Sequence, residues 1–423
     1  MSPSTSASAS IDAIWRIESP RVIAGVAHLV RDIGLAEDLA QDAFVAALEQ
    51  WPRDGIPSRP GAWLTAVAKR RAIDHLRRRQ RLDERIPVLG RQQQVEEEEV
   101  PDFDAALDEE EIRDDLLRLV CVACHPILSP DARVALTLRM VGGLRTDEIA
   151  RAFLVPEATV AQRIVRAKRS LAAAHVPFET PQRTELEERL ASVLEVVYLI
   201  FNEGYAATAG DDWMRPALCD DALRLGRVVA TLLPDEPEVH GLVALMEIQA
   251  SRTRARTGPG GEPILLLDQD RSRWDLVLIR RGLAALAQAE ALARSGLHPL
   301  GPYALQAAIA ACHARAPRAE DTDWVRIAAL YDALAQLQPS PVVELNRAVA
   351  VSRAFGPEAG LDLVERLVEE PALRSYHLLP SVRGDLLEQL GRTDEARAEF
   401  LRAASMTRNE RERALMLQRA ADA

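Results

Sequence analysis

The stretch that most constrains the fold runs from residue 129 to residue 171, where three helical patterns are separated by two short breaks. The first pattern ends at Gly142 and Gly143, and glycine is the residue most favoured at a helix C-terminus. Thr146 suits the N-cap of the second helix, and the two acids after it complement the helix dipole. Pro156 suits the first turn of the third helix. The stretch therefore predicts three helices with tight connections, as in a helix-turn-helix.

The third helix of this stretch has one apolar and one polar side. Its apolar residues follow helical spacing, which predicts a buried stripe formed by Val160, Ile164, Ala167 and Leu171. The polar side carries threonine, glutamine and arginine, the types that contact base edges in the DNA major groove. A solvated basic face is the alternative, but capping, spacing and charge together favour a DNA-reading helix. The candidate DNA-binding residues are Thr159, Gln162, Arg163, Arg166 and Arg169.

The distribution of charge supports nucleic-acid binding, although the net charge of −12 argues against it. Residues 1–90 carry a net charge of +2 and residues 116–176 one of +5, whereas residues 91–115 carry −10 and residues 177–423 carry −9. Two basic modules thus flank an acidic linker, and an acidic body follows. The N-terminal residues lack the features of a signal peptide, and no apolar run approaches the ~18 residues of a membrane span. We therefore expect a cytoplasmic protein without membrane contacts.

The first basic module contains a helical pattern from residue 35 to residue 51. Pro52 is predicted to end this helix, because proline removes a backbone donor and clashes with the preceding turn. One side is an apolar ridge formed by Leu35, Phe44 and Leu48, and the other side carries Glu37, Asp38, Gln41 and Asp42.

A second helical pattern in this module follows a loop rich in proline and glycine and spans residues 62–85. Trp63 lies on its apolar side, and a dense basic run begins at Lys69. A solvated helix end is the alternative interpretation. The aromatic and basic groups together favour a surface that holds a single nucleic-acid strand by stacking and charge.

The segments AEDLAQDAF and AWLTAVAKRRAIDHLRRR, followed by the helix-turn-helix, resemble an RNA polymerase sigma factor of the extracytoplasmic-function (ECF) type, in the sigma-70 family. The resemblance covers roughly residues 10–176. It implies that residues 11–86 form sigma region 2, which binds core polymerase and the −10 element, and that residues 116–176 form region 4, which reads the −35 element. It also implies core polymerase (its beta and beta-prime subunits) and promoter DNA as partners, with no cofactor and no enzymatic activity.

The same resemblance assigns residues to two further surfaces. The implied core-binding residues are Asp38, Gln41, Asp42, Phe44 and Leu48. The implied −10 residues are Trp63, Lys69, Arg70, Arg71, Asp74, Arg77 and Arg78. Arg70 stands where the family commonly has asparagine, so the −10 preference stays open.

Residues 87–115 connect the two modules, and twelve acids lie between Glu96 and Asp115. Such a run repels itself, which predicts an extended linker. A flexible solvated spacer is one interpretation. The family resemblance implies another, in which the linker threads the polymerase channel along the path of the nascent RNA.

Cys121, Cys124 and His125 have the C-x-x-C-H spacing of haem attachment, which could also supply three zinc ligands. The run around them, LLRLVCVACHPIL, is apolar and helical in pattern. Buried free cysteines behave as small apolar residues. We therefore interpret both thiols as packing residues and expect no metal site.

Residues 177–423 form one Ala- and Leu-rich helical pattern after another, so the sequence predicts an all-α chain with a large helical extension. Two helix–glycine–helix units have their glycines, Gly356 and Gly391, 35 residues apart, close to the ~34-residue tetratricopeptide (TPR) period. The extension thus resembles that of an ECF branch with a TPR-like regulatory domain. That branch implies a DGPF/YCII-like protein encoded nearby as a possible partner.

Two polar stretches interrupt the helices of the extension. They contribute a candidate regulatory surface formed by Asn202, Glu203, Tyr205, Asp268, Asp270, Arg271 and Trp274. Capping and internal ion pairs of a packed loop are the alternative interpretation. No set of residues suited to catalysis stands out.

Two other functions compete with the sigma factor. A helix-turn-helix regulator with a TPR-type sensor would not need the helices of residues 35–51 and 62–85. A repeat scaffold with incidental basic helices would not bind core polymerase. Residues 1–10, polar and small, are predicted to form a disordered tail.

Overall fold

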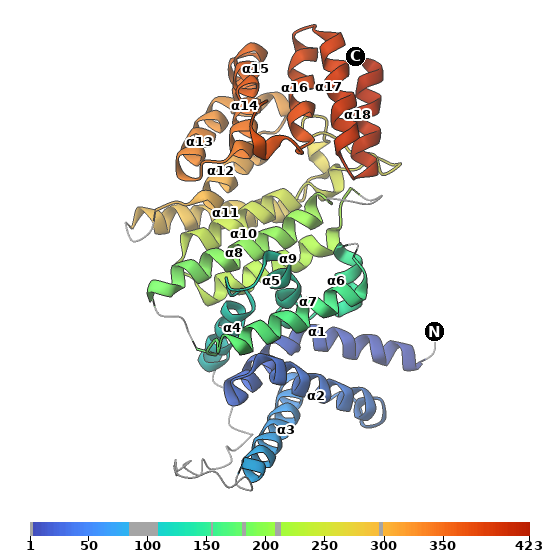
Figure 1. Cartoon of the computed structure of the whole chain (residues 1–423), viewed down its shortest axis with the longest axis vertical. Helices are drawn as coiled ribbons and strands as arrows, with labels where there is room; N and C mark the ends of the chain where they lie inside the picture. The colour runs from blue at the N-terminus through green and yellow to red at the C-terminus, as the bar shows by residue number, and fades with distance from the viewer. Residues whose placement is uncertain (1–2, 84–108, 154, 180–182, 208–212, 296–298) are drawn as a thin grey trace. The chain divides into compact units, whose positions relative to one another are not determined.

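The structure, a computed structural model, describes residues 3–83, 109–153, 155–179, 183–207, 213–295 and 299–423. Within these ranges the secondary structure is helical apart from turns and one isolated bridge between Thr257 and Pro263. The predicted all-α class is confirmed. The chain divides into two compact units, Met1–Val196 (unit 1) and Val197–Ala423 (unit 2) (Figure 1). No helix in the described ranges combines the length and apolar character that a membrane crossing requires.

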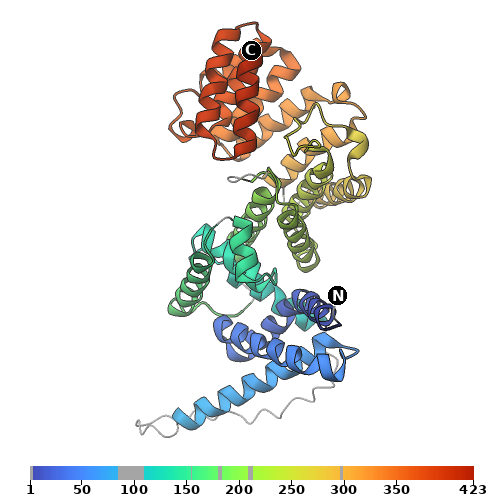
Figure 2. The same ribbon diagram turned by 90° about the vertical axis from the view of Figure 1, so that its right-hand side faces the viewer.

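Unit 1 begins with three helices that pack against one another: α1 (Pro3–Val30), α2 (Ile33–Asp54) and α3 (Pro60–Asp83). The C-terminal part of α3 projects beyond the other two (Figure 2). Trp15 of α1 stacks on Phe44 of α2 with ring centroids 4.7 Å apart. Trp51 of α2 meets Trp63 of α3 edge-on at 5.3 Å. These aromatic pairs join α2 to both of its neighbours.

The predicted disordered tail at residues 1–10 is wrong for the part that the structure describes, because α1 already begins at Pro3. Proline is favoured in the first turn of a helix, and the alternating serines and alanines after it oppose a helix only weakly.

The second helix passes its predicted end at Pro52 and continues to Asp54. Trp51, which is almost fully buried, anchors this last turn in the core, and its burial offsets the backbone bond that Pro52 cannot make. Gly55 terminates the helix with a φ of 87°, and its N–H donates to the Trp51 carbonyl at 2.9 Å.

The buried face of α2 also differs from the predicted one. Glu37 is only 4% exposed, although the sequence assigned it to the polar side, and Leu48 of the predicted apolar ridge is 36% exposed. Small residues let neighbouring helices approach closely, so a mainly alanine stripe packs inward instead of the larger apolar residues. The buried stripe consists of Ile33, Ala36, Leu39, Ala40, Ala43, Ala46, Ala47 and Trp51.

Four more helices complete the described two-module part of unit 1: α4 (Glu109–Ala123), α5 (Pro130–Met140), α6 (Thr146–Phe153) and α7 (Glu157–Ala173). Gly143 ends the α5 segment with a φ of 68°, and the Leu144 N–H donates to the Leu138 carbonyl at 3.0 Å. A Cβ on Gly143 would lie 2.8 Å from the Arg16 carbonyl oxygen, so α1 also requires glycine there. The predicted helix-turn-helix is confirmed.

The predicted extended linker, residues 87–115, is wrong at its C-terminal end, because α4 begins at Glu109. Acidic residues stabilise the N-terminal turn of a helix through its dipole, so this part of the acidic run favours a helix. Asp115 is buried and accepts a hydrogen bond from Arg118 Nη1 at 2.7 Å. Residues 84–108 lie outside the described residues.

Helix α8 (Arg183–Tyr205) crosses the division between the units. Its first part packs in unit 1, where Arg133 Nη1 donates to Ser192 Oγ at 2.5 Å and lies 2.8 Å from Glu195 Oε2. Ser192 Oγ in turn donates to the Cys124 carbonyl. These contacts explain why unit 1 extends to Val196, beyond the domain boundary that the sequence predicted after residue 176.

Unit 2 contains the rest of α8 and ten further α-helices within its described residues, and α10 packs against both α11 and α12. The helices are α9 (Pro216–Leu232), α10 (Pro237–Ala250), α11 (Leu276–Arg294), α12 (Pro302–Arg315), α13 (Trp324–Leu337), α14 (Pro341–Phe355), α15 (Pro357–Glu365), α16 (Leu378–Gln389), α17 (Thr393–Met406) and α18 (Glu410–Asp422).

The two predicted helix–glycine–helix units are confirmed. Gly356, with a φ of 104°, joins α14 to α15, and Gly391, with a φ of 74°, joins α16 to α17. Phe400 lies at the centre of a shared core that reaches from α14 to α18. The assignment of these pairs to the TPR family stays a prediction.

Candidate functional site

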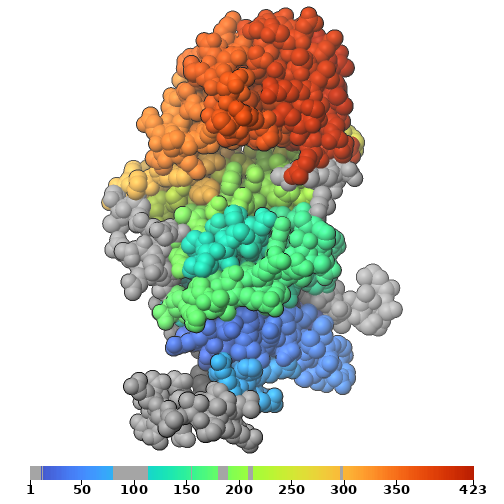
Figure 3. Space-filling model, in the orientation of Figure 1, coloured from blue at the N-terminus to red at the C-terminus, as the bar shows by residue number. Residues whose placement is uncertain are grey.

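Helix α7 presents the polar face that the sequence assigns to DNA. Its predicted stripe of Val160, Ile164, Ala167 and Leu171 is buried. On the other side Gln162, Arg166 and Arg169 are exposed, and Thr159 and Arg163 are half-buried. The helix forms part of the face drawn in Figure 3. The structure therefore leaves three of the five candidate side chains free of the protein core.

Arg163 is held by the neighbouring helix of its own module. Its Nη2 lies 2.7 Å from Asp131 Oδ2 on α5. Two-thirds of the Asp131 side chain is exposed, and an ion pair this open to water contributes at most about 1 kcal/mol. A DNA phosphate or base can therefore displace Asp131 at little cost.

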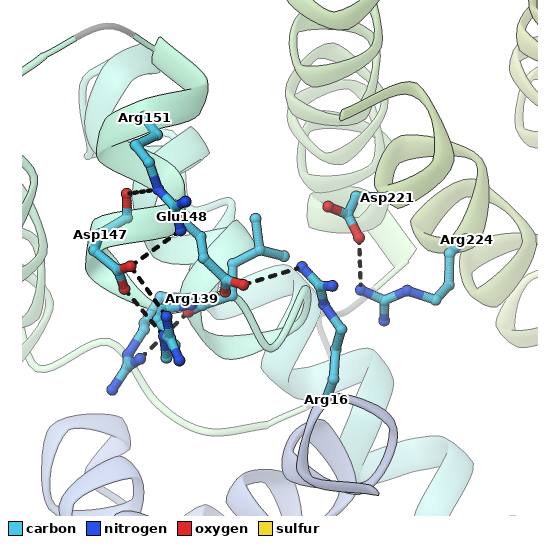
Figure 4. Close-up of polar contacts among 9 residues, drawn as sticks. Arg16, Arg139, Asp147, Glu148, Arg151, Asp221 and Arg224 are labelled. Carbon is cyan, nitrogen blue, oxygen red and sulfur yellow. Dashed lines mark hydrogen bonds and ion pairs between the residues drawn. The ribbon is translucent and has the colours of Figure 1, made fainter. Parts of the chain in front are cut away.

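A polar network fixes the start of α6, the helix that supports α7. The Arg145 N–H donates to Glu148 Oε2 at 2.8 Å, which completes a cap at the N-terminus of the helix. Asp147 pairs with Arg145 at 3.0 Å and with Arg151 at 3.1 Å (Figure 4). The hydrogen bond from Arg145 lowers the pKa of Asp147. Arg16 of α1 lies 3.9 Å from Glu148, so the network also reaches the first module.

Helix α3 divides the predicted −10 residues into two groups. The first group is exposed and consists of Arg70, Asp74, Arg77 and Arg78. The second group is half-buried and engaged: Trp63 packs against Trp51, and Arg71 Nη1 lies 3.2 Å from Asp42 Oδ2. Lys69, also half-buried, passes close to Gly25 of α1. The exposed group is the part of α3 available to a nucleic-acid strand in this structure.

The predicted core-binding residues lie along one helix, α2. Asp38 and Asp42 are well exposed, Gln41 is half-buried, and Phe44 is partly covered by Trp15. Leu48 shares the surface with Val45, which is 50% exposed and which the sequence did not suggest. The sequence could have indicated Val45, because residues three positions apart, such as Asp42 and Val45, lie on the same side of a helix. Acidic and apolar groups thus lie side by side on the surface of α2.

Glu37 joins the two modules of unit 1, and the sequence did not indicate this. Its Oε1 accepts from Arg139 Nε of α5 at 2.6 Å, and its Oε2 lies 2.5 Å from Lys168 Nζ of α7. Lys168 also lies 3.6 Å from Asp38 Oδ1. Burial alone raises the pKa of Glu37, but Arg139 and Lys168 lower it overall. The Glu37 clamp, formed by Glu37, Arg139 and Lys168, holds one end of α2 against α5 and α7.

A cleft of about 560 Å³ opens beside the clamp within unit 1. It is lined by residues of both modules, among them His28, Ile33, Arg118, Lys168 and Leu171. At the cleft the two modules are joined by the clamp, and elsewhere α1 of the first module packs against α4 and α5.

Cys121 and Cys124 are buried, as packing residues are. Burial raises the pKa of the Cys121 thiol to about 11 and that of the Cys124 thiol to about 12. Burial also lowers the pKa of His125 to about 4, with help from Arg189. Within the described residues no three His, Cys, Asp or Glu side chains form a metal-ligand group.

The buried thiols should resist modification in the folded protein. The thiolate is the reactive form, and the raised pKa values leave almost none of it at neutral pH. We expect an Ellman assay to show slow reaction of all four cysteines in the native chain and rapid reaction in denaturant. Rapid native labelling mapped to Cys121 or Cys124 would contradict the packing interpretation.

The structure brings together the two polar stretches of the extension. The guanidinium carbon of Arg252, after α10, lies 5.7 Å from the Tyr205 ring centroid and 5.9 Å from that of Trp274. Of the predicted regulatory surface, Asn202, Asp268 and Asp270 are exposed, whereas Glu203 and Trp274 are buried. Trp274 is thus not a surface residue, because its ring packs with Ala255 and Ile279 in a local core.

His313 of α12 lies buried near Arg252 and Arg271 and should make the folding stability of the extension decrease in acid. Burial, Arg252 and Arg271 lower its pKa to about 3, well below the ~6.5 of an unfolded chain. Between these two values the unfolded state binds the extra proton. Folding stability should therefore fall by about 1.4 kcal/mol per pH unit as the pH drops below ~6. Urea titrations at a series of pH values should show a smaller change of stability with pH in His313→Asn than in wild type. The control variant His240→Asn should show the same change as wild type.

Comparison with known proteins identifies the two modules of unit 1. Residues 14–82 match the family model of sigma-70 region 2, and residues 122–171 match that of sigma-70 region 4. Residues 189–290 match a family of unknown function, DUF6596. The region 2 match disfavours a simple helix-turn-helix regulator, because such a regulator needs no region 2.

Curated relatives agree with these matches. The uncharacterized protein R00370 of Rhizobium meliloti is 46% identical over 395 residues, which cover 93% of this chain and 91% of the relative. The RNA polymerase sigma-H factor of Pseudomonas aeruginosa is 30% identical over 163 residues, covering 37% of this chain and 81% of that protein. The probable ECF RNA polymerase sigma factor SigI of Mycobacterium tuberculosis is 29% identical over 161 residues, covering 38% of this chain and 54% of SigI. The chain therefore belongs to the extracytoplasmic-function sigma factors of the sigma-70 family, which bring core RNA polymerase to promoters at transcription initiation, and it carries a helical extension after region 4.

Proposed function

We propose that this sigma factor reads the −35 element with the exposed face of α7 and holds the melted −10 strand with the exposed face of α3. The exposure of Gln162, Arg166 and Arg169 opposite a fully buried stripe carries this proposal. Arginine and glutamine form paired hydrogen bonds with guanine and adenine in the major groove. Arg70, Arg77 and Arg78 supply the matching charge on α3.

We further propose that α2 binds core polymerase through Asp38, Asp42 and the apolar residues next to them. Exposed apolar side chains beside acids are typical of a surface that a partner covers. Gln41, Phe44 and Leu48 lie on the same helix, and Phe44, although stacked on Trp15, is only half-buried. This assignment locates the protein in the cytoplasm, with the polymerase.

The extension is proposed to regulate the promoter-binding modules. Support comes from α8, whose Ser192 and Glu195 both contact Arg133 of unit 1 and which continues into unit 2 as one helix. A conformational change in unit 2 can therefore be transmitted along α8 to region 4. A DGPF/YCII-like protein is the candidate partner of the extension, a prediction that rests on the family resemblance.

Run-off transcription with purified core polymerase tests the regulatory role. Full-length protein is compared with a fragment ending at Val196, because a cut after residue 176 would remove the partners of Arg133. Core binding of both forms is measured in parallel. We expect different transcript yields at equal core binding. Equal yields would contradict regulation by the extension.

The residue assignments are tested separately in the full-length chain. Alanine at Arg77 and Arg78 should reduce open-complex formation on duplex DNA and have less effect on a template whose −10 region is already unpaired. Equal loss on both templates would instead indicate that α3 provides general charge for DNA binding.

A further inference from the structure

An arginine–aromatic cluster lies inside the extension, away from all promoter-binding residues in sequence. Arg252 and Arg256 flank a short 3-10 helix after α10 and are 8% and 6% exposed. The guanidinium carbon of Arg256 lies 3.5 Å from the centroid of the Tyr205 ring. That of Arg271 lies 4.9 Å from the centroid of the Trp274 ring. Arg256 also lies 5.5 Å from the centroid of the Trp213 ring, so three cations converge on three aromatic rings.

No carboxylate in the described part of the chain forms an ion pair with these three arginines. Arg256 donates to the Tyr205 carbonyl, and Arg271 donates to the carbonyls of His313 and Ala316 at 2.7 and 2.6 Å. Among the described residues, the Arg252 side chain contacts the Tyr205 and Trp274 rings, and its buried Nε has no hydrogen-bond partner. The buried Trp274 Nε1 likewise has no acceptor among these residues.

Burying a charge without a counterion is costly. The penalty amounts to several kcal/mol for an ion removed from water, and a desolvated cation–π contact returns only about 2 kcal/mol of it. Burial lowers the pKa of Arg256, and Arg252 adds to this effect, although Tyr205, Cys219 and Glu412 partly oppose it. Without a bound anion, the buried positive charge at this position is therefore incompletely compensated, and an anion would stabilise it.

We propose that this cluster, formed by Tyr205, Arg252, Arg256, Arg271 and Trp274, is a binding site for the oxyanion group of a small ligand, a phosphate or a carboxylate. Guanidinium groups bind such groups through paired, charge-assisted hydrogen bonds. Arg252 Nε and Trp274 Nε1 supply donors for which no described residue provides an acceptor. Tyr205 and Arg271 are only half-buried, so the cluster is open to solvent on their side.

The site is independent of the promoter roles proposed above, because binding is measured without polymerase or DNA. The same chemistry can come from a phosphorylated metabolite or from an organic acid. Two probes, inorganic phosphate and succinate, separate these sources. The probe that binds more tightly identifies the class of ligand.

Isothermal titration calorimetry and thermal melting of the full chain test the proposal. We expect millimolar phosphate or succinate to bind and to raise the melting temperature above that in sodium chloride of equal ionic strength. Arg252→Gln should weaken binding by at least about tenfold, because it removes charged hydrogen bonds. Its melting temperature in chloride should equal or exceed that of wild type, since an unpaired buried charge is lost. A merely structural Arg252 would predict a lower one.

Arg254→Gln is the matched control. Arg254 lies two residues away on the same 3-10 helix, but its side chain is exposed. This variant should keep the anion response of wild type. The proposal is overturned if neither probe binds wild type, or if Arg252→Gln responds as wild type does.

A second variant covers the case in which Arg252→Gln does not fold. Trp274→Phe keeps an aromatic ring in the local core but removes the Nε1–H donor. We expect it to fold and to bind the preferred probe about threefold or more weakly, as the loss of one hydrogen bond predicts. Unchanged affinity in this variant would overturn the site as described.

Discussion

Replacement of both Gln162 and Arg166 by alanine is expected to lower promoter-directed transcription about 100-fold or more without changing affinity for core polymerase. A side chain that contacts a base edge contributes about 1–3 kcal/mol, or about 5- to 150-fold, so two contacts of about 1.4 kcal/mol each together reach about 100-fold. Both side chains are exposed, so their removal leaves no cavity in the module. The decrease in transcription should therefore result from weaker recognition of the −35 element.

Run-off transcription on the cognate promoter and on a version with a mutated −35 element measures this effect. On the mutated promoter the double variant and wild type should be equally poor. Arg151→Ala on α6 is the control, because Arg151 is an exposed arginine of the same module outside the recognition face. If Arg151→Ala fell as far as the double variant, general charge would explain the effect and base reading would not.

Glu37→Gln is expected to lower the stability of unit 1 by about 2–4 kcal/mol at neutral pH. The variant leaves Arg139 and Lys168 without their shared carboxylate, and breaking a buried pair by removing one partner costs about 3–5 kcal/mol. About one-fifth of each cationic side chain is exposed, which moves the expectation to the lower part of that range. Urea unfolding at neutral pH measures the change.

The control for this prediction is Asp38→Asn, one residue away. Asp38 is 76% exposed and lies 3.6 Å from the same lysine, so its loss should cost less than about 1 kcal/mol. The stabilisation by Glu37 should be fully present above the unfolded-state pKa of about 4.3 and should be lost as pH falls through its lower folded pKa. The difference between wild type and Glu37→Gln should thus shrink in acid. A difference in stability between wild type and Glu37→Gln that stayed constant from neutral to acidic pH would contradict the charge-based explanation.

The helix-turn-helix was predictable because its signals are local. Gly142 and Gly143, the acids after Thr146, and the spacing of Val160 and Ile164 each constrain the chain within a few residues. The stop at Pro52 was mispredicted for the opposite reason. Burial of Trp51 comes from packing against another helix, and a proline rule contains no information about it.

Residues of the candidate sites were predictable by type but not by environment. Gln162 and Arg166 were expected to be exposed, and they are. Glu37 was expected beside Asp38 on the polar side of α2, yet it is buried because two cations from residues 102 and 131 positions later neutralise it. A sequence pattern cannot show a partner at such a distance.

The sequence alone determined the all-helical class, the order of regions 2 and 4, and the polar face of α7, because helical periodicity, caps and motifs are encoded within short windows. Only the tertiary structure decided that Glu37 joins the two modules and that the stretches around Tyr205 and Trp274 meet at Arg252. Charges and rings acquire their roles from burial and from neighbours distant in the chain. Those neighbours are set by packing, which no short window of residues contains.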